Sequence, residues 1–407
     1  MARSGDGRVV FVRHSLPGER VHALVTATTT SFLRADAVTI LEESPDRVPP
    51  PCPHAGPAGC GGCDWQHVAV PAQRRLKEVL IAEHLRRLAG VDRHVPVEEV
   101  AGRPDGLGWR TRMQFAVDRA GRVGLHRHRS HDIEPIEHCP IATHELDAVG
   151  VGTTLWKGAR HVEVTASPDG GRPVIAVDTG RSRLAARPPD RAGLVVDGRV
   201  RRRPTKVHFD VLGNRFEVGP GVFWQVHPSA AAVLTRCVLE GLAPTTGERV
   251  LDLYAGAGLF SVPLAQAVGP GGSVVAVERS ARACADAGRN ARGHPQVRIV
   301  RSEVTPTVVA AEDPSDLVVL DPSREGAGPA VMRTLVAAPA TPRRIAYVSC
   351  DPASFARDLR VALDAGWVLN SLRAFDLFPM TEHVELVGLL EPGPRDRETG
   401  SGARSPA

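Results

Sequence analysis

Short β-branched runs alternate with alanine-rich segments through the carboxy-terminal half of the chain. Four such runs are "ERVLDL" (248–253), "GSVVAVE" (272–278), "DLVVLD" (316–321) and "RRIAYVS" (343–349), and the segments between them are long enough for helices. Buried strands that alternate with helices are typical of a parallel sheet covered on both faces. The pattern therefore predicts a doubly wound, Rossmann-like α/β domain over residues 211–392.

The amino-terminal part has another pattern, in which apolar and polar residues alternate over short stretches. Residues 7–41 contain about three such strands, whereas a closed OB-like barrel needs about five. A stretch rich in Pro and Gly ends this unit, and residues 108–206 again alternate between strand-like segments and turns. We expect a small N-terminal β barrel that lacks its first strand, followed by a central β-rich domain.

One helix is expected between the two β regions, over residues 71–88. Its apolar side chains would share one face, made of Leu76, Val79, Leu80, His84 and Leu88. The end of the chain is polar and contains Pro and Gly, which predicts a disordered tail. The expected division of the chain is 1–45, 46–210, 211–392 and the tail 393–407.

Length and composition bound the class of protein. A chain of 407 residues is too long for one ordinary core, and 42% hydrophobic residues indicate globular domains. No apolar run approaches the roughly 18 residues of a membrane span, so we expect a cytoplasmic protein that does not bind a membrane. The composition favours no particular oligomer, and a monomer is expected.

The net charge of the chain does not indicate a polyanionic partner, but one basic segment does. The net charge is +4, carried by 47 Arg and 3 Lys, and nine basic residues lie between Arg181 and Lys206. This basic stripe could contact the phosphates of RNA. The alternative is that an Arg-rich chain reflects a genome of high GC content.

The turn after the first strand of the α/β domain has the features of a cofactor site. Gly256 and Gly258 allow a tight turn, and Glu278, at the end of the next strand, can accept two hydrogen bonds from a ribose diol. The third glycine of a dinucleotide site is replaced by Ser261. Together with Asp252 before the turn, this favours S-adenosylmethionine (SAM) over a nicotinamide, the alternative being a structural αβ unit with no ligand.

Four polar side chains follow or end core strands: Asp252, Glu278, Asp321 and Cys350. Ligands of open parallel sheets bind outside the carboxyl ends of the strands. Four unrelated core strands would not need polar residues at that place, so we expect these side chains to line one site.

Cys350 has the setting of a nucleophile, although a free cysteine is often only a small buried hydrophobe. Another strand, within residues 374–390, carries His383 and Glu385 near its start, on one face, and Glu382 on the other. A thiolate can add to carbon 6 of a pyrimidine, and a carboxylate can later remove the proton from carbon 5. With a sulfonium methyl donor, these groups predict methylation of a pyrimidine at carbon 5.

The seven cysteines do not indicate a disulfide framework, because their number is odd and no leader precedes them. Cys52, Cys60 and Cys63 lie in the Pro/Gly stretch, and Cys139 follows much later. By ligand count these four could hold zinc or an iron-sulfur cluster equally well. The remaining two, Cys237 and Cys284, fall in helical segments and are expected in the core.

Five ordered stretches resemble the RNA uracil-5-methyltransferase family, whose members modify tRNA and 23S ribosomal RNA. They are "FWQVHPSAAAVL", "LDLYAGAGLF", "VLDPSREGAG", "VSCDPASFARDL" and "FDLFPMTEHVELV", and they cover most of residues 215–390. The resemblance implies a class I methyltransferase with Cys350 as the nucleophile and Glu385 as the base. It also implies donor contacts from Gln225, Tyr254, Gly256, Glu278 and Asp321. The chain departs from the usual residues at His227, Ser302, Glu303, Ser323, Asp351 and Met380.

The cysteine spacing resembles the subset of the family that carries a 4Fe-4S cluster, with Cys52, Cys60, Cys63 and Cys139 as ligands and zinc as the less favoured metal. Four neighbouring histidines, His126, His128, His131 and His138, are expected to be exposed or to face RNA. The first residues resemble the RNA-binding TRAM domain. Because the family usually has a strand before "DGRVVFV", we expect Met1 to be an internal start of a longer natural chain.

The combined prediction is a SAM-dependent enzyme that methylates carbon 5 of a uridine in ribosomal or transfer RNA through a covalent Cys350 adduct. One alternative is a cytosine-5-methyltransferase, which usually places its cysteine after a proline, where this chain has Ser349. The other is an inactive RNA-binding protein that has kept a SAM pocket.

Overall fold

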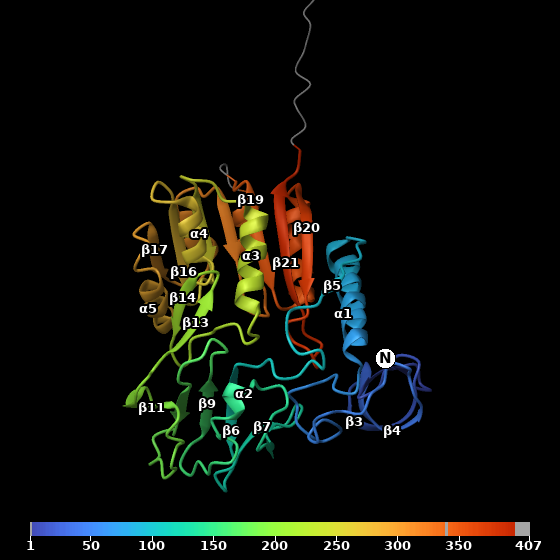
Figure 1. Cartoon of the computed structure of the whole chain (residues 1–407). Coiled ribbons are helices and arrows are strands. Elements are labelled where there is room, and N and C mark those ends of the chain that lie inside the picture. The colour runs from blue at the N-terminus through green and yellow to red at the C-terminus, as the bar shows by residue number, and fades with distance from the viewer. Residues whose placement is uncertain (1, 338–340, 395–407) are drawn as a thin grey trace, which may run out of the picture.

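The computed structural model describes residues 2–337 and 341–394, which form three sheet-based modules and a hairpin (Figure 1). The N-terminal sheet and the central sheet lie side by side below the large α/β sheet in this view. Apart from residues 393 and 394, the expected disordered tail lies outside the described residues.

The α/β sheet has the strand order β17-β16-β15-β18-β19-β21-β20-β5. Its strands are β15 (Arg249–Leu253), β16 (Ser273–Glu278), β17 (Val297–Arg301), β18 (Leu317–Leu320), β19 (Arg344–Ser349), β20 (Trp367–Phe375), β21 (Glu385–Pro392) and β5 (Val97–Glu98). Every neighbouring pair is parallel except the two pairs that involve β21. The prediction of a parallel α/β domain is confirmed, with one antiparallel strand added near its edge.

Helices cover both faces of this sheet and bury two apolar cores. They are α3 (Ala230–Leu242), α4 (Ser261–Val268), α5 (Ala281–Asn290), α6 (Pro306–Ala311), α7 (Pro329–Ala337) and α8 (Pro352–Asp364). The central strands β18 and β19 are short and mostly apolar because both of their faces are buried. None of the helices in the described ranges is long and apolar enough to span a membrane.

The central sheet confirms the expected β-rich region and has the order β12-β11-β10-β9-β6-β7-β8. Its strands are β6 (Arg112–Val117), β7 (Val123–His126), β8 (Ile133–Pro135), β9 (His161–Thr165), β10 (Val174–Asp178), β11 (Gly193–Val196) and β12 (Arg199–Arg202). The short helix α2 (His144–Asp147) packs into its core through Leu146. A hairpin of β13 (Val207–Val211) and β14 (Asn214–Val218) then leads into the α/β domain.

The N-terminal sheet contains the three expected strands and one more. They are β1 (Ala2–Arg3), β2 (Val9–Arg13), β3 (Arg20–Thr28) and β4 (Phe32–Glu42), in the order β1-β2-β4-β3. The added strand, β1, is only two residues long. In this order β1 and β3 form the edges, so the pairings describe an open four-stranded sheet.

The helix between the β regions is α1 (Val70–His84), continued by a π-helical turn, η1 (Leu85–Ala89), that ends at Gly90 with φ +71°. The predicted apolar face was only partly right, because Leu76 and Leu88 are half-buried against apolar cores whereas Val79 is not. Val79 is 62% exposed, whereas Gln73, Lys77 and Ile81 are fully buried. Periodicity failed here because the buried face carries a lysine and a glutamine, whose partners lie about 300 positions away.

Helix α1, η1 and strand β5 pack against the α/β sheet. Ile81 and Leu85 belong to the same apolar core as Leu251 and Leu386, and β5 pairs with β20 as the eighth strand of the large sheet. Residues 70–98 thus lie within the segment expected as the central domain, but they pack on the α/β sheet.

This packing gives a test of the corrected helix face. Ile81→Ala should lower the free energy of unfolding by about 2–5 kcal/mol, because it leaves a cavity in the core of the α/β sheet. Val79→Ala, on the same helix, should change it by no more than about 0.5 kcal/mol. Urea denaturation measures both values. Equal losses in the two variants would contradict the observed face.

Candidate active site

Five predicted residues lie at one edge of the α/β sheet because of its strand directions. Glu278 ends β16, while Asp321 and Cys350 directly follow β18 and β19. Asp252 lies one residue before the end of β15. Since β21 runs against β19, its first residue, Glu385, lies at the same edge.

The pairing of β19 with β21 sets the relation between the thiol and the carboxyl group. Ser349 is opposite Leu386, so the register, continued by one residue, places Cys350 opposite Glu385. The strand begins at Glu385, and His383 therefore precedes it. The period-two argument for His383 does not apply, since this residue belongs to the preceding loop.

The glycine-rich turn after β15 is held by Glu278. One carboxylate oxygen of Glu278 accepts a hydrogen bond from the Gly256 amide at 3.1 Å, and the other accepts one from the Ser280 amide at 2.6 Å. Tyr254 and Gly256 both have positive φ angles, +63° and +56°. A Cβ atom at Gly256 would meet no atom within 4 Å, so the turn leaves space for a ligand to approach the backbone.

A second acid, Asp252, is fully buried behind the turn. The Ser261 hydroxyl donates to one of its oxygens, and the other oxygen has no hydrogen-bond partner. Burial raises the pKa of Asp252 to about 7, and the charges of Asp321 and Glu278 act in the same direction. Ser261, which replaces the third glycine of a dinucleotide motif, is therefore a partner of the acid.

The nucleophile candidate is neutral in the isolated protein. Burial, followed by the charges of Glu385 and Asp321, raises the pKa of Cys350 to about 12, while Arg324 lowers it. Burial and the charge of Asp321 also raise the pKa of Glu385 well above its ordinary value, and burial raises that of Asp321 to about 7. A cation bound among these groups would favour the charged form of each of them.

Two polar networks that the sequence analysis missed shape the loops around the site. Asp351 accepts from the Ser354 amide and caps α8 immediately after Cys350. Asp358 accepts from the amides of Ala327 and Gly328 and from the Tyr347 hydroxyl, so it anchors the loop after Asp321. The Asp-Pro pair after Cys350 was a signal for the first network, but nothing local in the sequence signals the second.

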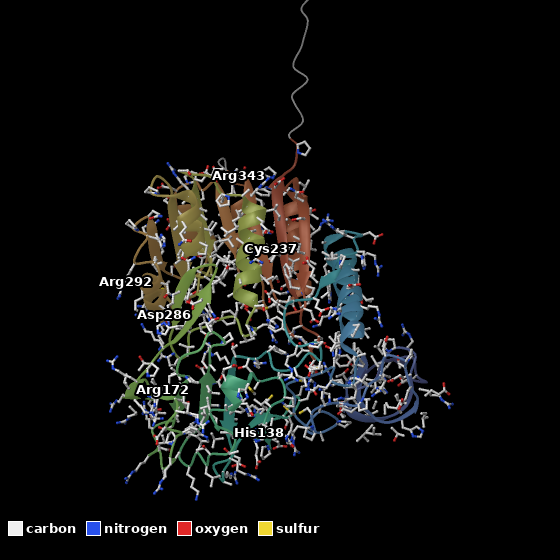
Figure 2. All side chains as sticks on the ribbon, viewed as in Figure 1. His138, Arg172, Cys237, Asp286, Arg292 and Arg343 are labelled. Carbon is white, nitrogen blue, oxygen red and sulfur yellow. The ribbon has the colours of Figure 1, made fainter. Side chains whose placement is uncertain are left out.

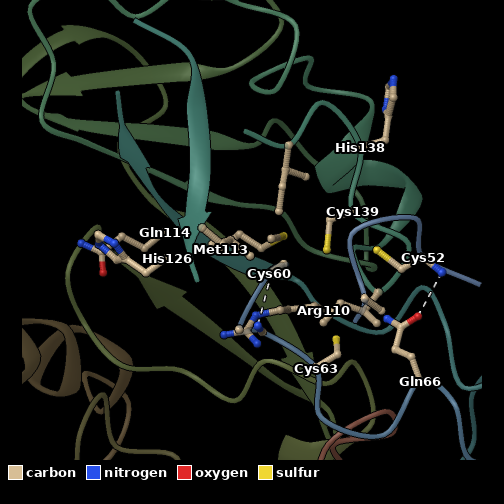
Figure 3. Close-up of a pocket in the computed structure, with 16 residues that line it drawn as sticks. Cys52, Cys60, Cys63, Gln66, Arg110, Met113, Gln114, His126, His138 and Cys139 are labelled. Atoms are coloured by element: carbon tan, nitrogen blue, oxygen red, sulfur yellow. Dashed lines mark hydrogen bonds between the residues drawn. The ribbon is translucent and has the colours of Figure 1, made fainter. Parts of the chain in front are cut away.

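Four of the cysteines line one cavity of about 220 Å³ between the Pro/Gly stretch and the central sheet module: Cys52, Cys60, Cys63 and Cys139 (Figure 3). All are free thiols. Burial raises the pKa of Cys63 to about 12 and that of Cys139 to about 11. Among the described residues, no three His, Cys, Asp or Glu side chains form a group that could hold a metal ion.

The rest of the cavity wall is mostly apolar, with one half-buried cation, Arg110. Burial lowers the pKa of Arg110, whereas the charges of Cys139 and Cys63 would raise it. His126 and His138 also line the cavity, but Figure 3 shows them directed away from the sulfur atoms. Each has another partner, the carbonyl of His131 at 3.2 Å and Asp147 at 2.9 Å.

The other two cysteines differ from each other. Cys237 is buried in α3, as expected (Figure 2). The prediction of a core position for Cys284 was wrong, since it is half-buried and its thiol donates to the carbonyl of Glu278 at 3.2 Å. Helical spacing could not show that this turn of α5 lies beside the glycine-rich turn.

The remaining predicted donor residue, Gln225, is buried and lies in the segment between β14 and α3. The next residue, Val226, accepts hydrogen bonds at its carbonyl from the Thr111 amide and hydroxyl at 2.9 and 2.8 Å. The central module is thereby attached directly beside Gln225.

Comparison with known proteins gives matches over both halves of the chain. The TRAM domain matches residues 1–38, and the methyltransferase small domain matches residues 214–340. An uncharacterized RNA methyltransferase of Streptomyces coelicolor is 47% identical over 96% of this chain and 90% of its own length. A 23S rRNA (uracil(1939)-C(5))-methyltransferase RlmD of Edwardsiella ictaluri is 32% identical over 95% and 91%.

A solved structure has a similar fold over nearly the whole chain. It is the Pyrococcus abyssi tRNA (uracil-54, C5)-methyltransferase in complex with S-adenosyl-L-homocysteine, with a TM-score of 0.71 and 23% identity. The match covers 95% of this chain and 98% of that one.

The buried acid behind the turn predicts a pH dependence of stability. The pKa of Asp252 is raised from 3.8 to about 7, so its favourable protonated form is lost as the pH rises through that range. Relative to Asp252→Asn, which stays neutral, wild type should lose stability between about pH 4 and about pH 7, on the order of 4 kcal/mol in total. Denaturation of both proteins across this range measures it. A constant difference would contradict the raised pKa.

Proposed function

Because the chain belongs to the RNA uracil-C5-methyltransferase family, we propose that it transfers the methyl group of SAM to carbon 5 of a uridine in ribosomal or transfer RNA. The observation that carries the proposal is the register that puts Cys350 opposite Glu385, at the sheet edge shared with Glu278 and Asp321. In the proposed reaction, that arrangement would supply the nucleophile, the base and part of the donor site at one edge of the sheet.

The reaction assigns one role to each of the two central side chains. The Cys350 thiolate adds to carbon 6 of uracil, and carbon 5 then attacks the methyl group, releasing S-adenosylhomocysteine. The Glu385 carboxylate takes the proton from carbon 5, the bond between carbon 6 and sulfur breaks, and the thiolate is restored. Atoms and charge balance without a further reactant.

The donor would be held by the turn and its neighbours: Gln225, Tyr254, Gly256, Glu278 and Asp321. Glu278 is oriented by two backbone amides, which leaves its remaining lone pairs for the ribose hydroxyls. The positive sulfonium of SAM would lie among acids whose pKa values are raised in its absence, and it would favour their charged forms. Binding of SAM would thus favour the charged carboxylate of Glu385, the form that accepts the proton.

For the cysteine cavity we propose a 4Fe-4S cluster held by Cys52, Cys60, Cys63 and Cys139, with zinc as the less favoured occupant. Four free thiols and no carboxylate line the cavity, a donor set suited to iron-sulfur clusters. Each thiol of such a site binds a different iron, so the sulfur atoms need not converge on one ion. A structural role is proposed, because methyl transfer moves no electrons.

The RNA would be held by the modules that surround the catalytic edge. The proposed division of the chain is 1–45 for an RNA-binding TRAM domain, 46–210 for the cluster and RNA surface, and 211–392 for methyl transfer. Most arginines of the basic stripe 181–206 are exposed, which supports phosphate contacts. A monomer acting on RNA in the cytoplasm completes the proposal.

The function is tested by nucleoside mass spectrometry of tRNA and ribosomal RNA from a strain that lacks the gene. We expect 5-methyluridine to disappear from one RNA and to return with wild type or Cys237→Ala, a control for loss of a buried thiol far from the site. Cys350→Ala should restore less than about one thousandth of the wild-type level, because no adduct can form. Unchanged RNA pools would contradict the proposal and favour an inactive RNA-binding protein.

The cluster is tested on protein purified without oxygen. Wild type should contain iron and acid-labile sulfide and absorb broadly in the visible range. Cys63→Ser and Cys139→Ser should lose most of both, whereas Cys284→Ser should keep them. Zinc without sulfide in the wild-type protein would overturn the cluster assignment.

A further inference from the structure

The loop between β20 and β21 leads directly to the proposed base. Phe375 at its start pairs with Glu385 at its end, so residues 376–384 form a closed connection at the catalytic edge. Within it, Met380 has a φ of +68°, a conformation that residues other than glycine rarely adopt. Contacts from outside the loop must maintain this conformation.

Gln73 of α1 supplies one set of these contacts. It is fully buried, and its side-chain oxygen accepts a hydrogen bond from the Met380 amide at 2.7 Å. Its side-chain nitrogen donates to the carbonyls of Val68 at 2.8 Å and Trp65 at 3.2 Å. The Trp65 amide in turn donates to the Met380 carbonyl at 2.9 Å, so both polar backbone groups of Met380 are bound.

Lys77, one turn further along α1, holds the first part of the loop. Its ammonium group is fully buried and donates to Asp376 at 2.6 Å and to the carbonyl of Phe378 at 3.1 Å. The Asp376 amide also donates to the carbonyl of Glu98 in β5 at 2.9 Å. Gln73 and Lys77 therefore bind the loop at three positions within nine residues of Glu385.

A helix that only needed to pack would place apolar side chains at these positions, as it does at Ile81. A buried ion pair is a poor source of stability compared with apolar packing of similar volume. The polar groups of Gln73 and Lys77 are instead directed at the backbone and the carboxylate of one loop, which fixes its conformation.

We propose that Gln73 and Lys77 are positioning residues that fix the loop 376–384 and thereby place Glu385 against the substrate. The inference rests on the proposed function for the role of Glu385, but the hold on the loop can be measured without it. A displaced Glu385 would leave the proton on carbon 5, and the bond between carbon 6 and Cys350 would then persist.

The first measurement is hydrogen exchange on the folded protein in wild type, Gln73→Met, Lys77→Met and Ile81→Val. Gln73→Met removes the hydrogen bonds with little change of volume, whereas Ile81→Val removes one buried methylene from the same helix. Exchange in peptides covering 376–386 should be at least tenfold faster in Gln73→Met, beyond any change in Ile81→Val. Equal exchange in these two variants would overturn the proposal, even if Lys77→Met does not fold.

The second measurement uses tritiated-methyl SAM and total RNA from the strain that lacks the gene. In Gln73→Met, the share of labelled RNA that stays bound to denatured protein should rise at least fivefold, in the same direction as in Glu385→Gln. A merely structural defect, as in Ile81→Val, should lower adduct and product in proportion, and that result in Gln73→Met would overturn the proposal. A loosened loop with no labelling in wild type would confirm the hold on the loop and contradict the proposed function.

Discussion

The antiparallel pairing of β21 with β19 is the constraint on which the rest of the site depends. In a wholly parallel sheet, the start of a strand lies at the edge opposite to its neighbours' ends, and Glu385 would be a strand length away from Cys350. Because β21 is reversed, its first residues lie beside the last residues of β19. A one-residue slip in this register would turn the carboxyl group to the other face of the sheet.

That constraint also crowds acids at the edge. Asp252, Asp321 and Glu385 all have raised pKa values in the isolated protein. Burial is the main cause for each of them. Such a region favours a cationic ligand over a neutral one of the same shape. The electrostatics of the site therefore agree with a sulfonium donor. S-adenosylhomocysteine, which lacks the positive charge, would be bound less tightly than SAM.

The sequence was sufficient for the features that depend on local pattern. The alternation of strands and helices predicted the α/β sheet, and the polar residues at strand ends placed Asp252, Glu278, Asp321 and Cys350 at one edge. The place of Glu385 at that edge depends on the reversed direction of β21, which the pattern did not predict. Features set by distant partners were not predictable. The buried face of α1 depends on Asp376 and Met380, β5 depends on β20, and the surroundings of Cys284 depend on how α5 lies over the turn.

The ion pair of Lys77 with Asp376 joins residues 299 positions apart. At a synthesis rate of about 5–20 residues per second, Asp376 leaves the ribosome roughly 15–60 s after Lys77. Throughout that interval the carboxylate that Lys77 pairs with in the folded chain has not been made, and burial of the lysine would leave its charge without that partner. The polar face of α1 therefore stays in water until the last strands are made, so this helix docks at the end of synthesis although it is made near the beginning.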